Sequence, residues 1–173
     1  MNNTGIVRKI DNLGRIVIPK EIRNLLNIKN GENLEIIVNN DEITLKKFYK
    51  LKKDINNIVN YLKIFDNLID SNFIITDRDK IIASSSKEIT IDSTLCKEIQ
   101  QILDERKQVV ENSLTRLEVS NNVIIENYYI ISPIIINTDL MGSIICYKNS
   151  SIKDVDVLST VLLNNLTKEN YSF

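Results

Sequence analysis

The chain has 173 residues, of which 43% are hydrophobic and 26% charged, and its formal net charge is −1. It contains no histidine and only two cysteines, Cys96 and Cys146, which removes the usual general base and leaves no cysteine pair at metal-binding spacing. No apolar run reaches the roughly 20 residues that a membrane helix needs. The N-terminus lacks a secretory signal, so we expect a cytoplasmic protein without membrane contact.

Charge is divided unevenly along this length. Residues 1–53 carry five more cations than anions, and residues 54–173 carry six more anions than cations. A basic module is therefore joined to an acidic one. The hydrophobic pattern also changes near residue 50, which predicts one domain at residues 1–50, a helix at residues 51–70 that belongs to the second domain, and the rest of that domain at residues 71–173.

Short strands around one short helix are predicted for the basic module. Residues 5–10 alternate between apolar and polar, and a turn leads into residues 15–18, which predicts a first hairpin. Pro19 suits the start of a helix over residues 20–26. A second hairpin, with strands at 34–38 and 43–47, closes the module. About 50 residues with so short a helix bury little surface, so we expect an obligate dimer.

One long motif carries a resemblance. The run GIVRKIDNLGRIVIPKEIRNLLNIKNGENLEIIV resembles the DNA-binding domain of the AbrB family of bacterial transition-state regulators, without gaps over residues 5–48. The paired signature TGIVRKID and LGRIVIPKEIR is specific. The resemblance implies a swapped-hairpin fold, in which two chains interleave their hairpins into one small barrel. It also implies that arginines of both chains contact double-stranded DNA.

The same resemblance assigns DNA contacts residue by residue. The predicted contacts are Arg8, Lys9, Arg15, Lys20, Arg23 and Asn24. Family arginines fall on Arg8, Arg15 and Arg23, whereas Asn24 stands where the family commonly has another arginine. An arginine forks two hydrogen bonds to phosphate or guanine, whereas a lysine acts mainly as a point charge. Without the resemblance, charged residues on short strands are usually a solvated face.

A heptad-like seam begins at residue 51. Its members are spaced by 4, 3, 4, 3 and 4 residues: Leu51, Ile55, Ile58, Leu62, Phe65 and Ile69. Such a seam is typical of a helix that packs against another helix. The helix is either buried against its own domain or packed against a second chain. Packing between chains would make the assembly a homodimer or a homotetramer.

The remainder predicts an α+β domain in which helices flank an antiparallel sheet. The expected elements are a hairpin over 73–85, a helix over 94–106, strands near 127–133, 134–137 and 141–148, and a helix over 153–168. With FIITDRD, SPIII and MGSIICYK, this order resembles a GAF domain. The resemblance implies an unidentified small-molecule ligand between the sheet and its covering loops.

Residue types alone give little support for such a ligand site. The side chains expected to line it are Arg78, Arg116, Tyr128, Tyr129 and Tyr147. Tyrosines in strands are more often half-buried packing residues. We predict no catalytic residue, no metal ligand and no cofactor, and the two cysteines are expected to pack in the core.

Three functions are compatible with these patterns. The first is a sequence-tolerant DNA-binding transcriptional regulator of sporulation genes, modulated through its GAF-like domain by a ligand or by oligomerisation. The second is an antitoxin that uses the same swapped-hairpin fold. Such antitoxins usually end in a disordered toxin-binding tail, whereas this chain continues into an ordered domain. The third is a GAF-type thiol reductase, which the apolar setting of both cysteines disfavours.

Overall fold

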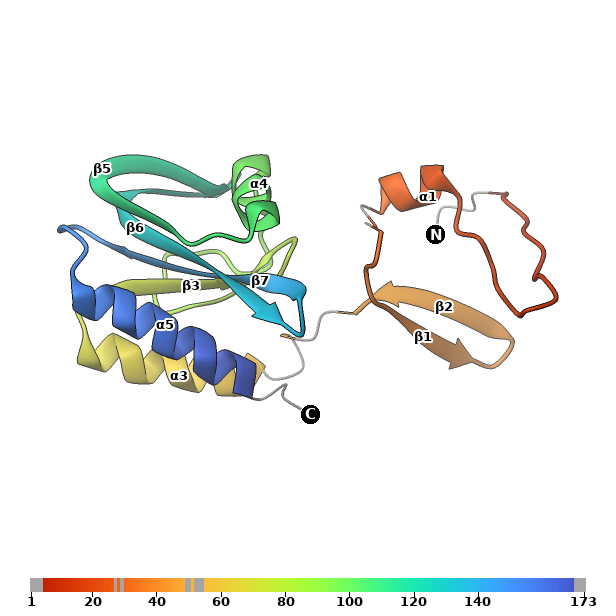
Figure 1. The fold of residues 1–173 in the computed structure, drawn as a ribbon, viewed down its shortest axis with the longest axis horizontal. Helices are drawn as coiled ribbons and strands as arrows, with labels where there is room; N and C mark the ends of the chain where they lie inside the picture. Colours follow the sequence, from red (N-terminus) through yellow and green to blue (C-terminus); the bar gives the residue numbers. More distant parts are fainter. Residues whose placement is uncertain (1–4, 27, 29, 49–50, 52–54, 170–173) are drawn as a thin grey trace. The chain divides into compact units, whose positions relative to one another are not determined.

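The computed structural model describes residues 5–26, 28, 30–48, 51 and 55–169. The chain separates into two compact units, residues 1–48 and residues 49–173 (Figure 1). No helix among the described residues is long and apolar enough to cross a lipid bilayer.

The N-terminal unit contains one helix and one hairpin. Helix α1 spans Lys20–Leu25 and directly follows Pro19, as predicted. Strand β1 (Leu34–Asn39) pairs antiparallel with β2 (Glu42–Lys47), which confirms the second predicted hairpin. Asn40, in the turn between them, has a φ of 49°, a left-handed conformation that asparagine tolerates better than most residues.

The first predicted hairpin is wrong for a single chain. Residues 5–18 are all described and contain no strand. The predicted turn is present: the N–H of Gly14 donates to the carbonyl oxygen of Asp11 at 3.0 Å, and the N–H of Asp11 donates to the carbonyl oxygen of Arg15 at 3.1 Å. A strand requires a neighbouring strand for its backbone hydrogen bonds, and these two arms have no such neighbour among the described residues of their own chain.

A five-stranded antiparallel sheet forms the centre of the C-terminal unit, in the order β4-β3-β7-β6-β5 (Figure 1). The strands are β3 (Asn72–Thr76), β4 (Ile81–Ser84), β5 (Val109–Ser120), β6 (Val123–Ile136) and β7 (Asp139–Lys148). The hairpin predicted over residues 73–85 and the strand predicted near 141–148 are confirmed.

One strand was missed by the sequence analysis, and one predicted boundary between strands is wrong. Strand β5 was not expected, because its sequence is largely polar and its pairing with β6 shifts register between Glu111 and Thr115. Strand β6 runs through Pro133, where the sequence predicts two separate strands. Pairing between β5 and β6 extends only as far as Ile131, so β6 has β7 as its single neighbour at Pro133. A proline is tolerated at such an edge because no ladder hydrogen bond is lost.

Helices cover both faces of the sheet. Helices α3 (Ile55–Leu68) and α5 (Asp154–Glu169) lie side by side on one face, and α4 (Lys97–Glu105) covers the other (Figure 1). The three helices predicted for this unit are confirmed. Alternation along β7 divides the core: Ile144 packs with α3 and α5, whereas Ile145 packs with α4.

The seam predicted for helix packing lies in the chain's own core. Leu51, Ile58, Leu62 and Phe65 are at most 5% exposed, and Ile55 and Ile69 pack against the same cluster. The alternative of a helix buried against its own domain accounts for these side chains. A contact between chains through this seam stays a prediction, and the large apolar residues that α3 exposes are Ile64 and Leu68.

Helix α5 turns its polar face towards the sheet. Its buried residues are Asp156, Ser159, Thr160, Leu163, Asn164 and Thr167. Its exposed apolar residues are Val155, Leu158, Val161 and Leu162, with exposed fractions between 43% and 67%. The apolar positions that mark this segment as a helix therefore lie mostly outside the core.

Hydrogen bonds make the burial of this polar face possible. Thr160 donates to the carbonyl oxygen of Asp156 at 2.8 Å. The side-chain nitrogen of Asn164 donates to the Ser132 hydroxyl at 3.0 Å and to the carbonyl oxygen of Pro133 at 2.9 Å, whereas its Oδ1 has no hydrogen-bond partner among the described residues. A buried polar group that keeps its hydrogen bonds costs little free energy.

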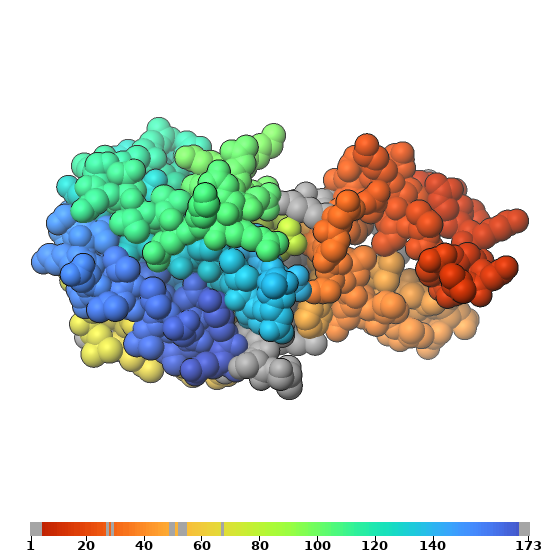
Figure 2. Space-filling model, viewed as in Figure 1, coloured from red at the N-terminus to blue at the C-terminus, as the bar shows by residue number. Residues whose placement is uncertain are grey.

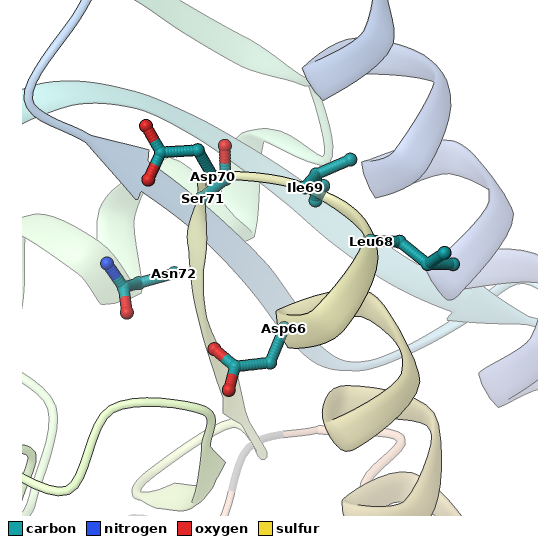
Figure 3. Close-up of a pocket in the computed structure, with 6 residues that line it drawn as sticks. All are labelled: Asp66, Leu68, Ile69, Asp70, Ser71 and Asn72. Atoms are coloured by element: carbon teal, nitrogen blue, oxygen red, sulfur yellow. The ribbon is translucent and has the colours of Figure 1, made fainter.

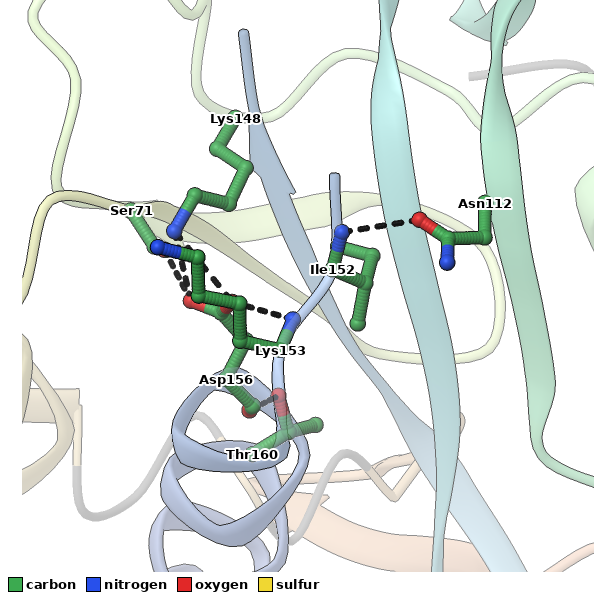
Figure 4. Close-up of polar contacts among 7 residues, drawn as sticks. All are labelled: Ser71, Asn112, Lys148, Ile152, Lys153, Asp156 and Thr160. Atoms are coloured by element: carbon green, nitrogen blue, oxygen red, sulfur yellow. Dashed lines mark hydrogen bonds and ion pairs between the residues drawn. The ribbon is translucent and has the colours of Figure 1, made fainter. Parts of the chain in front are cut away.

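A buried ion pair fixes the start of α5 (Figure 4). The carboxylate of Asp156 accepts hydrogen bonds from Nζ of Lys148 at 3.0 and 3.2 Å, from the Ser71 hydroxyl at 2.6 Å and from the N–H of Lys153 at 2.8 Å. Burial alone raises the pKa of Asp156, but the hydrogen bonds from Ser71, Lys153 and Lys148 outweigh it and hold the pKa below its ordinary value. The group therefore joins β7, the segment before β3, and α5.

We predict that Asp156→Ala lowers the free energy of unfolding of the C-terminal unit by roughly 3–5 kcal/mol, because Lys148 is left buried without its counter-charge. Chemical denaturation followed by circular dichroism measures this effect. Asp154→Ala, an exposed change in the same helical turn, is the control and should cost less than about 1 kcal/mol.

The same pair gives a pH dependence. Because the folded-state pKa of Asp156 is lowered, its stabilisation is present above the unfolded-state pKa of about 4 and is lost as the pH falls further. The stability difference between wild type and Asp156→Ala should therefore shrink in acid. A constant difference would show that ionisation of Asp156 does not stabilise the fold.

Candidate nucleic-acid interface

Arg15 is held in place by an aspartate four residues earlier. Its Nε donates to Oδ2 of Asp11 at 2.8 Å, while Oδ1 of Asp11 accepts the backbone N–H groups of Leu13 at 2.9 Å and Arg15 at 2.8 Å. Gly14, with a φ of +75°, supplies the left-handed residue of this turn. The hydrogen bonds from the backbone and side chain of Arg15 lower the pKa of Asp11, so the carboxylate is ionised at neutral pH.

Arg23 is more buried than the other predicted arginines. Its Nη1 donates to Oδ1 of Asn30 at 2.8 Å, which ties α1 to the segment before β1. Its Nε is buried and has no hydrogen-bond partner among the described residues. By contrast, the side chain of Arg15 is 71% exposed, and Arg8 is also exposed.

The other predicted contacts are on the surface. Arg8 and Lys9 precede the turn, whereas Lys20 and Asn24 lie on α1, and all four are exposed. Figure 2 shows residues 5–18, in red, at the surface of their unit. The unit of residues 1–48 has a formal charge of +2, since three cations of the basic module, at positions 50, 52 and 53, follow it.

The N-terminal unit also lacks an apolar core of its own. Among its described residues, Pro19 is the only buried one. Val7 is 85% exposed and Val17 73% exposed, and Ile36 and Ile43 of the hairpin are 67% and 68% exposed. Exposed apolar surface of this extent marks an interaction site.

The residues predicted to line a ligand pocket do not converge. Tyr129 and Tyr147 are paired across β6 and β7 and are buried in the core beneath α4, where burial raises the pKa of both hydroxyls. Tyr128 lies on the opposite face of β6. Arg116 is exposed and forms an ion pair with Glu118 at 2.9 Å.

A hollow of about 350 Å³ lies where α3 leads into β3 (Figure 3). Its lining residues are Asp66, Leu68, Ile69, Asp70, Ser71 and Asn72. All six belong to one continuous segment, and the side chains of Asp66 and Leu68 point to opposite sides of the ribbon. Two carboxylates repel phosphate, so this hollow lies outside a nucleic-acid interface.

The two cysteines lie on opposite faces of the sheet. Cys146 belongs to the core shared with α3 and α5, whereas Cys96 packs against the cluster beneath α4 and donates to the carbonyl oxygen of Glu118. Burial raises the pKa of the Cys146 thiol to about 11, so it is protonated and unreactive at neutral pH. This arrangement does not pair the thiols for redox chemistry.

Comparison with known proteins assigns the chain to a family. Residues 54–165 match the family model described as stage V sporulation protein T C-terminal, transcription factor. Stage V sporulation protein T of Bacillus subtilis (strain 168) is 36% identical over 165 residues, which cover 90% of this chain and 90% of that protein. The chain belongs to the stage V sporulation protein T family. Because this is a family of transcription factors, the prediction of a regulator and not an enzyme is confirmed.

The N-terminal part has relatives of its own. Residues 7–55 match the model described as antidote-toxin recognition MazE, bacterial antitoxin. Transition state regulatory protein AbrB of Bacillus subtilis (strain 168) is 54% identical over 48 residues, 28% of this chain and 50% of that protein. The prediction of an AbrB-like N-terminal domain is therefore confirmed.

Solved structures identify the C-terminal fold. A GAF sensor protein from Burkholderia vietnamiensis has a TM-score of 0.50 at 15% identity, over 70% of this chain and 77% of that one. A free methionine-R-sulfoxide reductase from Neisseria meningitidis has a TM-score of 0.52 at 11% identity, over 68% and 77%. At such low identity the likeness shows the fold alone. It confirms the GAF-like α+β prediction and adds no support for a reductase.

An interaction at the candidate interface that the sequence did not reveal is the hydrogen bond between Arg15 and Asp11. The sequence indicated only a turn at residues 11–14. The available signal was an aspartate four residues before an arginine, with Gly14 between them, since an aspartate in a turn readily accepts hydrogen bonds from the residues that follow it.

Proposed function

We propose that this transcription regulator binds double-stranded DNA in the cytoplasm as an interleaved homodimer. The contacting residues are Arg8, Lys9, Arg15, Lys20, Arg23 and Asn24. The observation that carries the proposal is the N-terminal unit itself, which combines exposed cationic side chains with apolar residues that one chain cannot bury. Relatives named as transcription regulators match this same segment.

A second copy would supply the missing core. The arms before and after the turn at residues 11–14 have the alternation of strands, but no strand partner within the part of the chain that the structure describes. In a swapped-hairpin dimer, the arms of each chain pair with those of the other and bury residues such as Val7, Val17 and Ile36. Burial of these side chains stabilises the dimer by about 25 cal/mol per Å² of apolar surface removed from water.

The antitoxin is the second candidate function, favoured by the description of the model that matches residues 7–55. Two observations make it the weaker one. A folded unit with a complete core follows the N-terminal unit. The relative that matches across both units is a sporulation protein.

The C-terminal unit is proposed to join two dimers into a homotetramer. Helices α3 and α5 lie side by side, and each exposes large apolar residues: Ile64 and Leu68 on α3, and Val155, Leu158, Val161 and Leu162 on α5. A ligand of the GAF-like unit would regulate DNA binding only by favouring one arrangement of this assembly over another.

Arg15→Ala is predicted to weaken binding to many DNA sequences. Six arginines per dimer give a log–log salt dependence with a slope of roughly −5, and loss of two reduces its magnitude by about 2. Fluorescence anisotropy with labelled duplexes over a series of salt concentrations measures both quantities. Arg116→Ala, which removes the same charge from the C-terminal unit, serves as control. An unchanged salt slope in Arg15→Ala would show that Arg15 does not contact the DNA.

Asn24→Arg restores the residue that the AbrB family commonly has at this position. We expect tighter DNA binding and a salt slope steeper by about 2 per dimer, because each chain gains one phosphate-binding cation. The same titration measures the change, with Asn122→Arg in the C-terminal unit as control. Equal binding by the two variants would place Asn24 away from the DNA.

Leu158→Glu is predicted to convert tetramers into dimers, because a charge on the apolar surface of α5 must be desolvated in the assembled state. Sedimentation equilibrium of the full chain measures the mass. Ile124→Glu, at an apolar residue of β6 that is 47% exposed, should leave the tetramer intact. A wild-type protein of dimer mass would contradict the tetramer.

A further inference from the structure

We infer that Asp11 is a positioning residue for DNA binding, which holds the guanidinium group of Arg15 so that its outer edge is presented to the DNA. This inference rests on the proposed function, since it assigns Asp11 a role at the same interface. Asp11 itself contacts no DNA in this proposal and acts through Arg15.

The geometry around Asp11 restrains both ends of Arg15. The backbone of Arg15 is fixed by two hydrogen bonds: its N–H donates to Oδ1 of Asp11 at 2.8 Å, and its carbonyl oxygen accepts the N–H of Asp11 at 3.1 Å. The guanidinium is fixed by its inner nitrogen, Nε, which donates to Oδ2 at 2.8 Å. Within the described part of the chain, Nη1 and Nη2 have no partner.

The outer nitrogens form the edge that an arginine uses to fork two hydrogen bonds to phosphate or to guanine. A long side chain that is already oriented loses less conformational entropy when it binds. The hydrogen bond at Nε therefore orients Arg15 for a bidentate contact and leaves Nη1 and Nη2 available to make it.

Charge alone gives no reason for an acidic residue at this position. A carboxylate beside Arg15 lowers the local positive potential, which opposes the approach of phosphate. The side chains of Arg15 and Asp11 are 71% and 42% exposed, and ion pairs this exposed contribute little to folding. Orientation of the arginine is the effect by which this carboxylate strengthens DNA binding.

The competing explanation is that Asp11 only stabilises the turn. Asp11→Asn separates the two roles, because an asparagine keeps the oxygen that accepts the N–H groups of Leu13 and Arg15 but loses the charged acceptor for Nε. Asp41→Asn is the matched control. Asp41 is exposed in the turn between β1 and β2, so this variant makes the same charge change in the same unit without affecting Arg15.

The experiment measures the affinity of the full chain for a labelled mixed-sequence duplex at fixed salt. It compares wild type, Asp11→Asn, Asp41→Asn, Arg15→Ala and the double variant of Asp11→Asn with Arg15→Ala. We expect Asp11→Asn to bind about five- to tenfold more weakly than Asp41→Asn, although the two proteins have the same net charge. In the Arg15→Ala background, Asp11→Asn should cause no further weakening.

A direct measurement on the free protein accompanies the titrations. Exchange of the Arg15 Nε–H with water, followed by NMR, should be slow in wild type and fast in Asp11→Asn, because the hydrogen bond to Oδ2 is lost. Fast exchange in the wild type would overturn the inference, since the arginine would then not be held before DNA binds.

The other outcomes are equally decisive. Equal or tighter binding by Asp11→Asn than by Asp41→Asn, or weakening that persists without Arg15, overturns the positioning role. Loss of the wild-type melting transition in Asp11→Asn also overturns the positioning role, because Asp11 would then be required for folding of the turn. If Arg15→Ala itself binds normally, the proposed interface fails as well. If Arg15→Ala binds weakly while Asp11→Asn matches its control, the inference about Asp11 alone fails.

Discussion

The buried carboxylate of Asp156 holds together three separate segments of the C-terminal unit. A buried charge must be surrounded by donors, and Asp156 takes them from Ser71, Lys148 and the backbone of Lys153. These partners belong to segments far apart in the sequence, so one group holds α5 against both the end of β7 and the start of β3. The same anchor sets the rotation of α5 about its own axis, with its polar face on the sheet and its apolar face in water.

The two units thus expose apolar surface for different reasons. The N-terminal unit has too few residues and too little secondary structure to enclose Val7, Val17 or Ile36. The C-terminal unit has two complete core clusters, one on each face of its sheet, yet leaves Leu158 and its neighbours outside because hydrogen-bonded polar groups fill the space beneath α5. Both surfaces fit the proposed assembly of several chains, and the two proposed contacts are chemically independent.

In the proposed DNA interface, the position and orientation of the arginines matter more than the amount of charge. The unit of residues 1–48 has a formal charge of only +2, and Asp11 lies beside one of its most exposed arginines. A modest charge combined with oriented arginines suits binding that depends on a few geometrically defined contacts. In the proposed interface, Asn24 further reduces the electrostatic attraction to DNA, since it stands where the AbrB family commonly has a cation.

Local patterns were enough to predict α1, the hairpin of β1 and β2, the helices of the C-terminal unit and the strands β3, β4 and β7, because periodicity, turn residues and Pro19 act over a few positions. The resemblance to the AbrB family supplied the candidate interface residues around Arg15. Strand β5 was not predictable because its sequence is largely polar and its pairing with β6 is irregular. The passage of β6 through Pro133 was not predictable because it depends on where the neighbouring strand β5 ends. Local sequence was therefore sufficient for the helices, for five of the seven strands and for the positions of the cations. The buried face of α5 and the way Arg15 is held became visible only in the folded chain, because each depends on hydrogen bonds whose geometry forms on folding.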